Sequence, residues 1–142
     1  MNPEELKART KMFARRIIRF VRTLPDDLTG RTLAAQLLRS GTSVAANYRA
    51  ACRAKSRADF ISKMGTVEEE SDESALWLDL LITENLTRSP DAAALKAEAE
   101  ELTAIAVSSI VTARGSPRPG GQVSLPRPTR ADNPKSAIRN PR

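Results

Sequence analysis

Five acidic side chains lie close together in the middle of the chain, and carboxylates at this density could hold a metal ion or do acid-base chemistry. Glu69, Asp72 and Glu73 are spaced three and four apart, which places them on one face of a helix. Carboxylate metal sites in helix bundles, however, recruit ligands from several helices and usually include histidine, and this sequence has none. We therefore interpret these acids as ion-pair partners of basic helices, with metal binding as a remote alternative. Glu68 borders the apolar stripe of its helix and needs a basic partner such as Arg39.

The absence of histidine and the presence of a single cysteine argue against most other kinds of catalytic site. Without histidine, the chain has neither the usual zinc ligands nor a histidine general base. Cys52 is the single cysteine; it could act as a nucleophile, but it lacks the histidine that usually activates one. We interpret it as a small residue at a helix end. The expectation is a protein that is not an enzyme and that has no cofactor and no metal.

Basic side chains gather in two stretches that could contact phosphate groups. Lys11, Arg15, Arg19 and Arg22 recur at helical spacing near the N-terminus. A second group, close together in sequence, consists of Arg49, Arg53, Lys55 and Arg57. A solvated or ion-paired face is the simpler interpretation, and nucleic-acid binding is the alternative. No exposed aromatic residue is interleaved with these bases, so such binding would depend on charge and shape rather than on base sequence.

Charge is distributed unevenly along the chain. The net charge of +6 comes entirely from residues 114–142, because residues 1–113 sum to zero. Within residues 1–113 the bases concentrate in 4–22 and 31–63, whereas most acids lie in 64–101. A basic half and an acidic half on one molecule favour a head-to-tail contact between copies, so we expect a homo-oligomer.

Four helices account for the positions of these side chains. Apolar residues at steps of three and four predict helices over residues 4–24, 32–52, 57–85 and from about 90 to 113. Pro25 ends the first helix, residues 26–30 form a turn, Ser56 and Asp59 open the third helix as a capping box, and Ser89 caps the fourth. Short links make an antiparallel up-down-up-down four-helix bundle, an all-α fold, the economical topology.

The second helix contains the densest packing signal. Leu33, Leu37, Val44 and Tyr48 share one stripe, and Gly41 lies on the same stripe without a side chain. Glycine in a helix interior is expected where two backbones approach closely or the helix bends. Tyr48 should pack with its hydroxyl at the surface, and Asn47 should satisfy a backbone group or a neighbouring subunit. The third helix carries Trp77 beside the stripe that runs from Phe60 to Leu81.

The last 29 residues differ from the rest. Proline and glycine recur throughout 114–142, and the bases there, among them Arg114 and Arg118, face a single acid. We predict a disordered basic tail after a bundle domain of residues 1–113. The sequence shows no signal peptide and no run of eighteen apolar residues, so we expect a cytoplasmic protein without a membrane contact.

Four segments resemble a known family: 36–44 (QLLRSGTSV), 46–50 (ANYRA), 57–60 (RADF) and 70–81 with Trp77 and Leu78. They are similar to the bacterial four-helix-bundle family named after the protein encoded in intervening sequences of 23S ribosomal RNA, and the resemblance covers roughly residues 5–113. That family also resembles the accessory protein of diversity-generating retroelements. The resemblance implies a four-helix bundle, a pentameric ring, and RNA, DNA or a nucleic-acid enzyme such as a reverse transcriptase as the partner.

Two functions from different classes remain open at this point. The first is a non-enzymatic oligomer that binds nucleic acid, or an enzyme acting on it, through basic surfaces. The second is a purely structural or protein-partner scaffold without nucleic acid. A ring of bases exposed around one mouth of an oligomer would favour the first function, and a fully ion-paired basic half would favour the second. Inward carboxylates from two or more helices would favour the remote metal-binding alternative.

Overall fold

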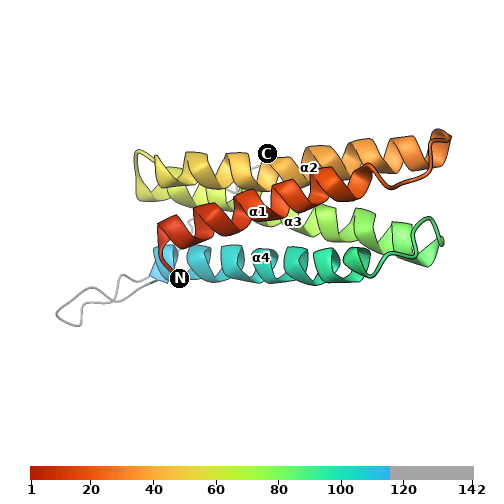
Figure 1. The fold of residues 1–142 in the computed structure, drawn as a ribbon. Helices are drawn as coiled ribbons and strands as arrows, with labels where there is room; N and C mark the ends of the chain where they lie inside the picture. The colour runs from red at the N-terminus through yellow and green to blue at the C-terminus, as the bar shows by residue number, and fades with distance from the viewer. Residues whose placement is uncertain (116–142) are drawn as a thin grey trace, which may run out of the picture. The chain divides into compact units, whose positions relative to one another are not determined.

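The computed structural model describes residues 1–115, and the predicted disorder of 116–142 lies outside the described residues. Four helices follow one another: α1 (Pro3–Val21), α2 (Leu28–Cys52), α3 (Arg57–Thr83) and α4 (Pro90–Gly115). Successive helices run in opposite directions (Figure 1), which confirms the predicted up-down-up-down bundle. Residues Met1–Ile110 form one compact unit, and Val111 begins a second. None of the helices within residues 1–115 is both long and apolar enough to cross a bilayer.

The helix ends depart from the predicted ones where capping was missed. Asn2 caps α1: its side chain accepts from the Glu5 N–H at 2.8 Å, while Glu5 Oε1 accepts from the Asn2 N–H at 2.9 Å. This capping box starts α1 at Pro3, one residue before the predicted start. The helix also ends at Val21, not at Leu24, because the chain tightens there: the Thr23 N–H donates to the Phe20 carbonyl at 3.0 Å. Pro25 then disfavours helical geometry at Leu24.

The second helix begins four residues earlier than predicted. Asp27 caps it by accepting a hydrogen bond from the Gly30 N–H at 2.8 Å, so Thr29 and Gly30, which we placed in a turn, are helical. A side chain at Gly30 would collide with the backbone carbonyl of Pro25. Glycine therefore allows the link between α1 and α2 to pass close over the first turn of α2.

The third helix begins where predicted and ends slightly earlier. Ser56 Oγ accepts from the Asp59 N–H at 3.0 Å, as an N-cap does. At the other end Asn85 has a positive φ of 58°, and the Leu86 N–H donates to the Leu81 carbonyl at 2.9 Å. This is a Schellman C-cap in which asparagine takes the left-handed position. The helix thus ends at Thr83, two residues before the predicted Asn85.

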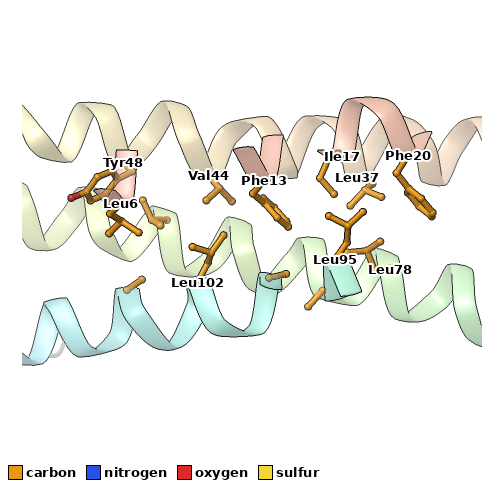
Figure 2. Close-up of a cluster of buried hydrophobic side chains, with 14 of the residues drawn as sticks. Leu6, Phe13, Ile17, Phe20, Leu37, Val44, Tyr48, Leu78, Leu95 and Leu102 are labelled. Carbon is orange, nitrogen blue, oxygen red and sulfur yellow. The ribbon is translucent and has the colours of Figure 1, made fainter. Parts of the chain in front are cut away.

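Side chains from all four helices of the unit meet in one core (Figure 2). The predicted stripes of α1, α2 and α3 are buried, except that Leu24, which lies beyond the end of α1, Leu33 and Phe60 are only half-buried. Along α4 the periodicity predicts a core face of Leu95, Glu98, Leu102, Ile105 and Ser109, widened by Ala99, Ala106 and Ile110. Glu98, Ile105 and Ser109 are only half-buried, at the edge of the core. The buried residues of α4 are Ala92, Leu95, Ala99, Leu102, Ala106 and Ile110.

Hydroxyl groups join the helices within the core. Ser40 on α2 and Ser74 on α3 lie 2.8 Å apart, and Ser71 on α3 lies 2.8 Å from Thr103 on α4. Each hydroxyl also bonds to a carbonyl of its own helix. The two serines that interrupt the apolar stripe of α3 therefore have bonded partners on both sides of that helix.

Candidate nucleic-acid interface

The predicted basic residues lie on the molecular surface. Those on α1 and at its C-terminal end are exposed: Lys11, Arg15, Arg19 and Arg22. Those around the link between α2 and α3 are exposed as well: Arg49, Arg53, Lys55 and Arg57. Within residues 1–115, none of these eight side chains ion-pairs with an acid. Arg114 lies in the last turn of α4, inside a helix that extends two residues past the predicted boundary, and Arg118 lies outside the described residues.

The fold brings only some of these bases together. Lys11 and Arg49 line the same groove on α1 and α2, a hollow of about 440 Å³ whose other lining residues include Ala8 and Ala45. Arg19 lines a different groove of about 370 Å³ with Arg16 and Asp91, between α1 and α4. Lys11 and Arg22 are about 16 Å apart along the helix axis. The eight bases therefore form separate groups rather than one patch.

Other bases form ion pairs with acids of α3 and α4. Arg9 on α1 donates twice to Glu98 on α4, from Nε at 2.7 Å and from Nη2 at 2.8 Å, and again to Glu101 at 2.6 Å. These hydrogen bonds raise the pKa of Arg9 above its usual range. A bidentate, charge-assisted contact of this kind fixes the orientation of the arginine side chain as well as its position. Arg9 therefore joins α1 to α4 and is not available to another anion.

Arg39 acts in the same way between α2 and α3, with partners that differ from the prediction. It donates from Nη1 to Glu70 at 3.1 Å and from Nη2 to Glu73, not to Glu68. Glu70 and Glu73 are three apart on α3 and face α2, whereas Glu68 lies on another side of the helix. The hydrogen bond to Glu73, followed by that to Glu70, raises the pKa of Arg39.

The acidic run on α3 gives no sign of a metal site in the described part of the chain. No group of three or more acidic or cysteine side chains within residues 1–115 is arranged to hold an ion. Asp59, at the start of the same helix, accepts from Lys63 Nζ at 2.6 Å and from the Lys55 N–H at 3.0 Å. In a standard capping box this side chain would accept from the N–H of the N-cap residue, Ser56. Asp59 instead accepts from the N–H of Lys55, one residue earlier.

In residues 46–50 of α2, one of the segments that carry the family resemblance, the side chains make packing and backbone contacts. Asn47 Nδ2 donates to the Ser43 carbonyl at 2.8 Å, so the asparagine satisfies a backbone group of its own helix. Tyr48 is buried, and burial raises the pKa of its hydroxyl. On α3, Trp77 is half-buried, and its indole nitrogen is enclosed without a hydrogen-bond partner in the described residues.

Sequence reasoning missed a hollow at one end of the bundle. Leu6, Tyr48, Cys52, Phe60, Ile105 and Ser109 line a cavity of about 380 Å³, together with the first residues of the chain. The residues come from all four helices, so no local sequence pattern indicates the cavity. Cys52, predicted at a helix end, is the last residue of α2 and lies exposed at this cavity.

The sequence profile of the 23S rRNA-intervening sequence protein family matches residues 5–108. The chain belongs to this family. Among solved structures, a protein of unknown function from the S23 ribosomal protein family of Bacteroides thetaiotaomicron is 36% identical in sequence. The comparison covers 78% of this chain and 98% of that protein, with a TM-score of 0.69. The search of curated proteins found no match.

Proposed function

We propose that this member of the 23S rRNA-intervening sequence protein family is a non-enzymatic, homo-oligomeric binding protein that contacts the phosphate backbone of RNA or DNA through its exposed bases. One observation carries the proposal: the eight exposed bases named above have no acidic partner in residues 1–115, although residues 1–113 contain as many acids as bases. A fully ion-paired basic half would instead favour a scaffold without nucleic acid.

The ion pairs explain how a neutral bundle keeps free bases. Glu70, Glu73, Glu98 and Glu101 are held by only two arginines, Arg9 and Arg39. Exposed charges that are not neutralised internally attract counterions, and the release of those ions drives binding to a polyanion. The groove that Lys11 and Arg49 share is the strongest candidate for a phosphate contact, although Glu4, paired with Lys7 at 3.4 Å, also lines it.

Assembly is supported by apolar side chains exposed on both halves. Met12 on α1 is 45% exposed and Leu38 on α2 is 38% exposed, beside the bases. Leu76 on α3 is 49% exposed and lines a shallow groove with Asp72 and Asp79. An acidic, partly apolar face and a basic, partly apolar face on one molecule can pair between copies and close into a ring. The family resemblance suggests five copies, and a nucleic-acid enzyme such as a reverse transcriptase as a further partner.

The test compares charge-matched variants in a binding titration. Arg49→Gln with Arg53→Gln removes two unpaired bases, and Arg31→Gln with Lys96→Gln removes two bases that are ion-paired with Asp26 and Glu100. Both changes lower the net charge equally. We expect the first pair to weaken binding of mixed-sequence RNA and DNA at about 50 mM salt several-fold more than the second. Absence of binding by the parent protein would contradict the proposal and favour the scaffold function.

A further inference from the structure

The cavity at the end of the bundle combines apolar walls with a few polar groups. Leu6, Phe60 and Ile105 supply hydrocarbon and aromatic surface. The hydroxyls of Tyr48 and Ser109 and the thiol of Cys52 supply hydrogen-bonding groups. Small-molecule sites in proteins have this composition and a similar volume.

Tyr48 and Phe60 contribute to the cavity in different ways. Tyr48 is only 5% exposed, because its ring packs in the core beside Leu6. Its hydroxyl points away from the other labelled core side chains (Figure 2), toward the cavity. Phe60, half-buried, leaves part of its ring open to the cavity. A planar ligand with a polar edge can stack on such a ring and bond to the hydroxyl.

Unpaired bases lie next to residues that line this cavity. Arg49, which lines the neighbouring groove with Lys11, precedes Cys52 by three residues on α2, and Arg53 directly follows it. Arg57 precedes Phe60 by three residues, which places the two side chains next to each other on α3. Two acids in the same parts of the chain pair with other bases: Asp59 with Lys63 at 2.6 Å, and Glu4 with Lys7 at 3.4 Å. Three bases without an acidic partner in residues 1–115 therefore lie beside a cavity with an apolar and aromatic lining.

We propose that this cavity takes one unstacked base of a single-stranded nucleic acid, while Arg49, Arg53 and Arg57 contact the neighbouring phosphates. This inference rests on the proposed function and specifies its ligand. Aromatic stacking with a positive surround is how proteins hold single strands without strong sequence preference. The bases of a duplex are stacked and paired, so moving one of them into the cavity costs unstacking and unpairing energy. The cavity should therefore distinguish single strands from duplexes.

The experiment measures fluorescence anisotropy of a labelled mixed-sequence oligonucleotide, single-stranded or annealed to its complement, with the full-length protein. The parent protein should bind the single strand more tightly. Cys52→Leu fills the cavity from an exposed position, and it should reduce single-strand affinity about 5- to 100-fold while changing duplex affinity little. Ala46→Leu, which adds the same side chain to an exposed position of α2 outside the cavity, is the matched control.

Two further measurements distinguish the loss of a base site from the loss of folded protein. Phe60→Ala should reproduce the loss of single-strand affinity, and its far-ultraviolet circular dichroism melt checks that the half-buried position tolerates the change. Cys52 is the single cysteine of the chain, so its alkylation by N-ethylmaleimide can be followed without background. The single strand should slow this alkylation more than an equal concentration of bound duplex does.

The outcomes separate this inference from the proposed function. Equal affinity for both strand forms, unchanged by Cys52→Leu and Phe60→Ala, would overturn the cavity as a base site and leave charge-driven binding intact. Binding of neither form would overturn the proposed function, and the inference would fail with it.

Discussion

Gly41 and Gly65 both lie inside helices, but only Gly41 meets another element. A Cβ at Gly41 would lie 2.9 Å from Ile17 Cγ1 on α1, whereas a Cβ at Gly65 would meet nothing within 4 Å. Gly41→Leu should therefore destabilise the bundle by about 1 to 3 kcal/mol through overpacking, despite the better helix propensity of leucine.

Gly65→Ala is the control for this prediction. Because the position is open, alanine should raise the free energy of unfolding by about 0.5 to 1 kcal/mol through lower backbone entropy in the unfolded chain. Urea unfolding midpoints, compared at equal slope, measure both changes. A Gly41→Leu midpoint at or above that of the parent would show that α1 and α2 do not approach closely there.

Asp59, at the start of α3, contributes to the stability of the fold in a pH-dependent way. The hydrogen bond from Lys63, followed by that from the Lys55 N–H, lowers the pKa of Asp59 below its usual range. A carboxyl whose pKa is depressed on folding adds stability above its unfolded pKa and loses it as pH falls through the folded value. The melting temperature of the parent should therefore fall more steeply below about pH 4 than that of Asp59→Asn.

Asp72→Asn is the control for Asp59→Asn. Asp72 is exposed on the same helix and has no ion-pair partner within residues 1–115. Its removal deletes the same charge without breaking a contact. Identical pH profiles for the parent protein, Asp59→Asn and Asp72→Asn would contradict the role assigned to Lys63.

At the scale of helices, periodicity predicts the elements well and their ends less well. The stripe of α1 from Leu6 to Phe20 is buried as predicted, because three- and four-residue steps leave one orientation that removes these side chains from water. The start of α2 was missed because Asp27, three residues before Gly30, was interpreted as a turn rather than as a cap. In α4 the predicted face is correct at Ala99 and Ala106, which are fully buried, but not at Glu98, which bonds to Arg9 at the edge of the core.

The candidate sites were predictable in part for a similar reason. Exposure of bases such as Arg15 and Arg22 follows from their position opposite an apolar stripe. Partner choice does not follow, because it depends on helix register: Arg39 meets Glu70 and Glu73 rather than Glu68. The end cavity was unpredictable from local patterns, since it requires Leu6, Tyr48, Phe60 and Ile105 to converge from four helices.

At the scale of the whole molecule, the separation of charge predicts self-association. The acids of residues 64–101 and the bases of 4–22 and 31–63 lie in different parts of the sequence, and within residues 1–115 only some of them pair. We expect light scattering to show a homo-oligomer at high micromolar concentration and moderate salt, with weaker association as salt rises. A monomeric mass under these conditions would contradict the assembly.

The last prediction concerns the share of nucleic-acid affinity that residues 116–142 supply. Six bases in that segment face one acid, whereas residues 1–113 are neutral overall. Each neutralised phosphate lowers the logarithm of affinity by roughly 0.7 to 0.9 per tenfold rise in salt, so about four contacts give a slope near minus three. Truncation after Gly115 keeps every described residue, including Arg49, Arg53 and Arg57. It should flatten the slope and leave the contribution of the helices.

Titrations of the full-length and truncated proteins at three salt concentrations measure this slope directly. The preference for single strands should survive truncation, because every residue that lines the end cavity lies within Met1–Ile110. Overall affinity should fall for single strands and duplexes alike, since the bases removed contact phosphates rather than base edges. An unchanged slope after truncation would assign the phosphate contacts entirely to the exposed bases of α1 and α2 and of the link before α3.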